Sequence, residues 1–280
     1  MPSLTLQDRA PLTNTISIPK LGFGVYQLYG KSCQRAVLDA LEAGYRHIDS
    51  AQLYRNEADV GAAVQQSPLK REDIFLTTKV RQSAGSPERT YQSCVDSIEK
   101  VGGKSGYVDL LLIHIPGTGR ESREELWGAL EKLYADGRAK AIGVSNYRPQ
   151  HIEEMREYAK VWPPHINQVE LHPWCQQRDI VQYYQDNDIV LAAYSPLSCG
   201  DHLNDSTLGA IAEKHKKSPA QVLIRFALQK NWIPLPKSGN SDRIKQNADV
   251  FDFALDEGDI DTLSGLDRGK SGALFPANVR

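Results

Sequence analysis

The sequence predicts an α/β protein, a (β/α)₈ TIM barrel preceded by a short N-terminal β-hairpin. Apolar, β-rich segments alternate with helical patterns along the chain, and this order favours a parallel sheet. Eight strand–helix units are present, as in a typical barrel of roughly 250 residues. No Pro-, Gly- or Ser-rich linker divides the chain, so we expect residues 1–280 to form a single domain. A doubly wound sheet is the alternative arrangement.

The predicted strands are short apolar segments that follow the expected hairpin. In chain order they are Leu21–Val25, His47–Asp49, Ile74–Lys79, Val108–His114, Lys140–Ser145, Ile166–Glu170, Ile189–Tyr194 and Trp232–Leu235. Pro234 and Pro236 remove two backbone donors from the last strand, which is unusual for the interior of a sheet. We therefore expect strand eight to be short or irregular.

Capping residues mark the helices between these strands. Ser86 followed by Pro87 predicts a helix with a capped start and a proline at its first position. Ser122 and Glu125 have the spacing of a capping box and predict another helix start, with a stop at Gly137.

Composition narrows the function classes. The formal net charge of −2, from 33 basic and 35 acidic residues, does not indicate a nucleic-acid or membrane-surface partner. The four cysteines contain no C-x-x-C pair, and no apolar segment has the length of a signal peptide or a membrane span. We expect a cytoplasmic protein that acts on a small molecule.

Four polar residues lie at or just after three neighbouring predicted strands: Asp49, Tyr54, Lys79 and His114. Taken singly, each has an ordinary structural interpretation, such as a helix cap for Asp49 or a hydrogen-bonded core histidine for His114. In a barrel, however, neighbouring strands are about 4.8 Å apart, and their carboxyl ends form the face that carries the chemistry. The sequence therefore predicts that these side chains converge.

This set of side chains suits proton transfer to a carbonyl oxygen. A free phenol has a pKa of about 10 and is a weak acid unless a cation stabilises the phenolate. Lys79 can be that cation for Tyr54, and Asp49 can keep Lys79 charged. His114 can orient the carbonyl oxygen. Nothing in the set supplies reducing equivalents, so we expect a hydride-bearing cofactor.

Common cofactor and metal motifs do not match. Gly22 and Gly24 lack the third glycine of a dinucleotide fingerprint, and His172 with Cys175 is too small a set of ligands for a metal site. A phosphate site is predicted after strand eight, where Lys237, Ser238 and Arg243 precede or begin a helix. These residues would suit a ribose 2′-phosphate, which favours NADPH over NADH.

Three ordered segments resemble the signatures of the aldo-keto reductase superfamily, and the resemblance covers nearly the whole chain. The segments are Gly44–Gly61, which reads GYRHIDSAQLYRNEADVG, Lys140–Tyr147, which reads KAIGVSNY, and Leu235–Asn247, which reads LPKSGNSDRIKQN. The resemblance implies a barrel that binds NADP(H) across its carboxyl-terminal face. It is strongest to compact microbial and fungal reductases of aldehydes and ketones.

The resemblance also assigns cofactor contacts. Ser145, Asn146 and Gln168 would hold the nicotinamide amide, and Tyr194 would stack on the nicotinamide ring. The remaining contacts would be Ser195, Pro196 and Leu197 at the pyrophosphate, Lys237, Ser238 and Arg243 at the 2′-phosphate, and Gln246 and Asn247 at the adenine.

Two positions depart from the family pattern in the expected substrate pocket. Tyr26 and Ile115 stand where tryptophans are frequent in the family, so the substrate itself stays open. The sequence predicts an NADPH-dependent carbonyl reductase, monomeric as is usual in the family. Two alternatives remain: a noncatalytic redox-sensing or regulatory subunit on the same scaffold, and a hydrolase that uses Asp49 and Glu170 as paired carboxylates.

Overall fold

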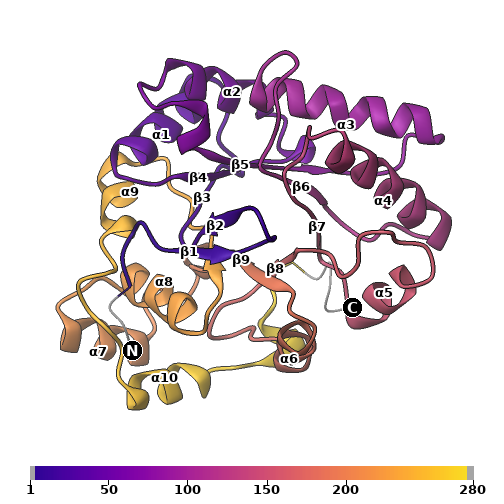
Figure 1. Cartoon of the computed structure of the whole chain (residues 1–280). Helices are drawn as coiled ribbons and strands as arrows, with labels where there is room; N and C mark the ends of the chain where they lie inside the picture. Colours follow the sequence, from indigo (N-terminus) through magenta and orange to yellow (C-terminus); the bar gives the residue numbers. More distant parts are fainter. Residues whose placement is uncertain (1–3, 276–280) are drawn as a thin grey trace.

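Eight parallel strands form a sheet that curls into a barrel in the computed structural model, which describes residues 4–275 (Figure 1). From β3 to β10, strands that follow one another in the chain are neighbours in the sheet. The strands are β3 (Phe23–Gly24), β4 (His47–Asp49), β5 (Phe75–Val80), β6 (Leu110–Ile113), β7 (Ile142–Ser145), β8 (Ile166–Glu170), β9 (Val190–Tyr194) and β10 (Ile233–Pro234). The predicted fold class is confirmed, and the doubly wound alternative is wrong because sequential strands remain neighbours throughout.

Helices follow the strands and cover the outside of the barrel (Figure 1). They are α1 (Gly30–Glu42), α2 (Glu57–Gln66), α3 (Pro87–Gly102), α4 (Arg120–Ala135), α5 (Pro149–Met155), α6 (Arg178–Asp186), α7 (Ser206–His215), α8 (Pro219–Gln229), α9 (Ser241–Ala248) and α10 (Glu257–Ser264). Short 3₁₀ turns are η1 (Gln52–Tyr54), η2 (Arg71–Asp73), η3 (Ser198–Gly200) and η4 (Gly269–Gly272).

The barrel closes where β3 meets β10. The amides of Gly22 and Gly24 donate to the carbonyl oxygens of Pro234 and Pro236, at 3.1 and 3.0 Å. On the other side of the strand, the Leu235 amide donates to Ala193 of β9 at 3.0 Å. Pro234 of β10 and Pro236 just after it therefore serve as acceptors toward β3, which explains how a short β10 tolerates them.

The barrel interior is filled from one end by the N-terminal hairpin. Strands β1 (Arg9–Pro11) and β2 (Ser17–Pro19) pair antiparallel, as predicted. Leu12 and Ile18 of this hairpin join a buried cluster of inward-facing strand residues. Close packing inside the barrel also requires glycine at position 22, because a Cβ on Gly22 would lie 2.5 Å from the His47 ring.

The helix predictions differ in accuracy. Ser86 caps α3 through its side chain, which accepts from the Arg89 amide, and Pro87 is the first helical residue, as predicted. The predicted capping box at Ser122 is wrong, because α4 already begins at Arg120. Glu125 instead accepts hydrogen bonds from the hydroxyls of Ser83 and Thr90, and so joins α4 to the start of α3.

None of the helices within residues 4–275 combines the length and the apolar character that crossing a bilayer requires.

Candidate active site

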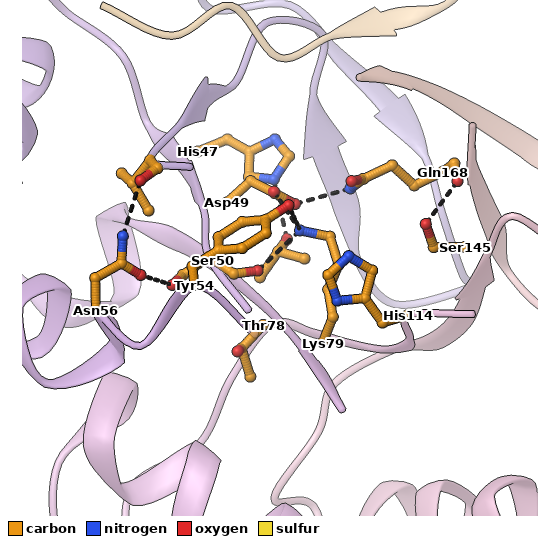
Figure 2. Close-up of polar contacts among 12 residues, drawn as sticks. His47, Asp49, Ser50, Tyr54, Asn56, Thr78, Lys79, His114, Ser145 and Gln168 are labelled. Carbon is orange, nitrogen blue, oxygen red and sulfur yellow. Dashed lines mark hydrogen bonds and ion pairs between the residues drawn. The ribbon is translucent and has the colours of Figure 1, made fainter. Parts of the chain in front are cut away.

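Asp49, Tyr54, Lys79 and His114 lie together at the carboxyl ends of β4, β5 and β6 (Figure 2). The Lys79 side chain is fully buried, and its Nζ lies 2.5 Å from Asp49 Oδ1. The same ammonium donates to the Ser50 carbonyl oxygen at 2.8 Å and to the Tyr54 hydroxyl at 3.3 Å. The predicted convergence of the four residues is therefore present in the structure.

Strand alternation brings these side chains inward. Successive side chains of a strand point to opposite faces, and Phe75 of β5 belongs to the inward-facing cluster. Lys79 lies four residues later on β5, so it faces the same way at the open end of the barrel. His114 likewise follows Leu110 and Leu112, two further members of this cluster.

The loop after β4 holds Tyr54 through contacts that the sequence analysis missed. Asn56 donates from its amide to the carbonyl oxygens of Val25 and Leu28, both at 2.8 Å. Its Oδ1 accepts from the Ser50 hydroxyl at 2.8 Å. The buried Asn56 thereby ties the loop that carries Tyr54 to the segment after β3 (Figure 2).

The electrostatics of the pair Lys79 and Tyr54 differ in part from expectation. Burial alone would lower the Lys79 pKa, but Asp49 and Tyr54 outweigh it and raise that pKa, so the ammonium stays charged. Burial raises the pKa of Tyr54, and the nearby Lys79 only partly offsets this increase. The expected stabilisation of the phenolate by Lys79 is therefore present, but burial outweighs it and the net pKa of Tyr54 is raised. Tyr54 is held in its protonated form, in which it can donate.

His114 is a neutral imidazole at physiological pH. Burial, together with the positive charges of Lys79 and Arg81, lowers its pKa to about 3. Its ring contacts the Tyr54 ring edge-on, with centroids 5.6 Å apart. A neutral histidine beside a protonated tyrosine can donate a hydrogen bond to a bound oxygen without releasing a proton.

The residues expected at the nicotinamide form a hydrogen-bonded chain that reaches Asp49. The Tyr194 hydroxyl donates to Asn146 Oδ1 at 2.9 Å, and Asn146 Nδ2 donates to Ser145 Oγ at 3.1 Å. The Ser145 hydroxyl donates to the carbonyl oxygen of Gln168 at 2.8 Å, and the Gln168 side chain donates to Asp49 Oδ2 at 2.8 Å (Figure 2). The expected cofactor slot and the four-residue cluster are thus one connected network.

The loop after β9 and the start of α9 contain the residues expected at the phosphates. Ser195 has a left-handed backbone, with φ of 50°, and turns the chain away from Tyr194. Pro196 is buried and Leu197 is half-buried. In the same loop, the Ser198 hydroxyl is buried without a partner among the described residues.

At α9, Arg243 and Lys237 are exposed, and neither makes an ion pair with a described residue. Arg243 Nε lies 3.3 Å from the hydroxyl oxygen of the buried Ser238. Gln246 is exposed and Asn247 is buried on the same helix. Two uncompensated cations beside a helix start are the donors that a phosphate group needs, so these residues fit a phosphorylated dinucleotide.

The two residues expected in the substrate pocket border the cluster. Tyr26 is 39% exposed and Ile115 is 41% exposed, unusually high fractions for large apolar side chains in this chain. The Tyr26 ring centroid lies 5.0 Å from that of Tyr54. Both side chains are therefore accessible at the edge of the site.

The arrangement of Glu170 speaks against a hydrolase with paired carboxylates. Glu170 is fully buried, and its two oxygens accept from the amides of Leu274 and Phe275 and contact His172 Nε2. A carboxylate whose oxygens are occupied in this way is not free to exchange protons with a substrate.

Comparisons with known proteins agree with this geometry. Residues 20–268 match the model of the aldo/keto reductase family. An uncharacterised oxidoreductase from Schizosaccharomyces pombe is 43% identical over 91% of this chain and 92% of its own, and glyoxal reductase from Bacillus subtilis is 40% identical over 94% of each. The crystal structure of an aldo/keto reductase from Brucella melitensis has a TM-score of 0.87 at 43% identity, covering 93% of this chain and 99% of that one.

Proposed function

The chain belongs to the aldo/keto reductase family of oxidoreductases, and from that premise we propose that it reduces an aldehyde or ketone to the alcohol with NADPH. When bound, NADPH supplies the hydride for the carbonyl carbon. The observation that carries the proposal is the buried contact of Lys79 with both Asp49 and Tyr54, beside a neutral His114. Such a cluster has no evident structural purpose at the open end of a barrel.

In the proposed reaction, Tyr54 donates its phenolic proton to the carbonyl oxygen. Lys79 stabilises the phenolate that forms, and Asp49 keeps Lys79 charged. His114 donates a hydrogen bond to the same oxygen and orients it. Because its raised pKa keeps Tyr54 protonated at neutral pH, the proton that reduction requires is in place when a carbonyl binds.

The proposed cofactor contacts follow the family assignment. Tyr194 would stack on the nicotinamide, and Ser145, Asn146 and Gln168 would hold its amide. Ser195, Pro196 and Leu197 would lie along the pyrophosphate, Lys237, Ser238 and Arg243 would bind the 2′-phosphate, and Gln246 and Asn247 would contact the adenine. Lys237 and Arg243, which form no ion pair with any residue between 4 and 275, support NADPH as the preferred cofactor.

A change of Arg243 to alanine is expected to weaken NADPH binding by about 10- to 100-fold, because a charge-assisted hydrogen bond to the 2′-phosphate is lost. NADH binding should change little, since NADH has no phosphate there. Fluorescence titration of both cofactors measures the two affinities. Equal losses for NADPH and NADH would contradict a 2′-phosphate contact; Lys245→Ala, an exposed cation on the same helix, is the control.

The pH profile tests the protonation states. Because the His114 pKa is lowered to about 3 and the Tyr54 pKa is raised, kcat/KM for reduction is expected to stay flat between about pH 5.5 and 9. The rate should fall only as Tyr54 loses its proton in more alkaline solution. An inflection near the ordinary histidine pKa of about 6.5 that disappears in His114→Gln would contradict a permanently neutral imidazole.

The substrate is proposed by class. Ile115 and Tyr26 leave space where larger aromatic side chains are frequent in the family, and one relative is named for the reduction of glyoxal. We therefore place small dicarbonyls, ketoesters and aromatic aldehydes first. NADPH oxidation followed by absorbance across such a panel tests the proposal. Tight NADPH binding without turnover of any carbonyl would contradict it.

A further inference from the structure

Six residues form a closed circuit of contacts at the open end of the barrel, the mouth of the candidate site. In order they are Tyr194, Phe275, Tyr26, Tyr54, His114 and Asn146. The ring centroids of Phe275 lie 6.1 Å from Tyr194 and 6.4 Å from Tyr26. Asn146 completes the circuit, because it contacts the Tyr194 hydroxyl and donates to the His114 carbonyl oxygen at 3.0 Å.

Phe275 differs from the other five members in its origin. Those five lie in or after the barrel strands β3, β4, β6, β7 and β9, and the Asn56 contacts described above fix the loop of Tyr54 to the segment after β3. Phe275 comes from the segment after α10, which is not part of the barrel sheet. Its position must therefore be set by other contacts.

Glu170 supplies those contacts. The amide of Leu274 donates to Glu170 Oε1 at 2.7 Å, and the amide of Phe275 donates to Oε2 at 2.8 Å. Glu170 ends β8 and pairs in register with Tyr194 on β9. The carboxylate that holds the backbone of Phe275 thus lies beside the residue that Phe275 contacts in the circuit.

The carboxylate is itself fixed. His172 Nε2 lies 3.0 Å from Glu170 Oε1, and both side chains are fully buried. A buried carboxylate is costly unless donors satisfy it, and here three nitrogens do so. The proposed reduction makes no use of Glu170, so its contacts indicate a positioning role.

The chain before Phe275 is attached to the loop after β8. The Arg268 amide donates to the Trp174 carbonyl oxygen at 2.9 Å, and the Gln176 side chain donates to the Ser264 carbonyl oxygen at 3.0 Å. Gly272 packs so closely on this loop that a Cβ there would lie 1.8 Å from Trp174 O. The whole C-terminal segment 264–275 therefore lies against the β8 side of the mouth.

We propose that Glu170 acts as a latch that holds the C-terminal segment across the mouth, so that Phe275 becomes the specificity-determining wall of the substrate pocket. Phe275 provides an aromatic surface between Tyr194 and Tyr26. The part of this proposal that concerns substrate rests on the proposed function, whereas attachment of the segment by Glu170 does not.

The attachment is tested by limited trypsin digestion without cofactor or substrate. Lys270 is exposed and precedes the latched residues, and mass spectrometry detects cleavage after it. Glu170→Gln keeps the shape but loses one acceptor, so we expect cleavage at least about tenfold faster than in the wild type. Leu274→Pro removes one of the two donors in the tail and should have the same effect even if Glu170→Gln folds poorly. Glu213→Gln, the same change at an exposed site on α7, should be cleaved as the wild type.

The wall is tested by kinetics with an aromatic aldehyde. Phe275→Ala and Leu274→Pro should each raise KM by about tenfold, the scale of burying one large apolar side chain, with kcat nearly unchanged. Phe275→Tyr, which keeps the ring, should restore the wild-type KM. Wild-type cleavage in both latch variants would overturn the latch, and a wild-type KM in Phe275→Ala would overturn the wall. If the wild type reduces no carbonyl, the proposed function fails while the digestion still decides the latch.

Discussion

Replacement of Tyr54 by phenylalanine is expected to lower kcat for carbonyl reduction by about 10²- to 10⁴-fold, the range measured for loss of a general acid. The change removes only the hydroxyl that donates the proton and contacts Lys79 Nζ. The ring, its contact with Tyr26 and the cofactor slot stay in place. NADPH affinity should therefore be unchanged, and single-turnover absorbance measurements separate binding from chemistry.

Tyr26→Phe is the matched control for this experiment. Tyr26 borders the same site, and its ring contacts that of Tyr54, but no hydrogen bond joins its hydroxyl to Lys79. A loss in Tyr26→Phe as large as in Tyr54→Phe would show that any change of tyrosine at this mouth is harmful. Full activity in Tyr54→Phe would exclude Tyr54 as the proton donor.

Replacement of Lys79 by methionine is expected to remove both activity and stability. The phenolate of Tyr54 would lose its stabilising cation, and the buried Asp49 would keep a carboxylate without a positive partner. Breaking a buried ion pair in this way costs about 3–5 kcal/mol in the free energy of unfolding. Urea denaturation followed by fluorescence measures this loss, and NADPH oxidation measures the activity.

The double variant Asp49→Asn/Lys79→Met separates the two effects. An amide at position 49 carries no charge and can still accept from Gln168, so most of the lost stability should return. Activity should not return, because Tyr54 still lacks its cation. Recovery of activity together with stability would mean that Lys79 serves only the fold.

The strands and the four-residue cluster could be predicted because the relevant information is local. Alternation along a strand sets the face of each side chain. Lys79 and His114 follow inward-facing apolar residues, and Asp49 is the last residue of β4. The position of Tyr54 depends on non-local contacts as well, because Asn56 holds its loop through hydrogen bonds to the backbone of distant residues. The net direction of the Tyr54 pKa could not be predicted, because it depends on how deeply the phenol is buried, which its neighbours in sequence do not reveal.

The latch could not be predicted for a related reason. Glu170 binds backbone amides, which every residue except proline carries, so Leu274 and Phe275 have no sequence signal as its partners. In the sequence, Glu170 has the context of an ordinary acidic residue at a strand end, which is equally compatible with a hydrolytic carboxylate. The same limit explains the helix start at Arg120, where Gly119 precedes the helix without a side-chain cap.

The junction of β3 with β10 has a consequence for how the chain acquires its structure. The strands that meet there come from opposite ends of the barrel sequence, whereas every other strand pair is formed by consecutive segments. Loop-closure entropy makes contacts between distant segments slow to form. Closure at Gly22, Gly24, Pro234 and Pro236 should therefore be a late step of folding, after the consecutive units have assembled. The proposed phosphate-binding residues after β10 would acquire their final positions only then. The ability to bind cofactor would therefore appear during folding only once the barrel is complete.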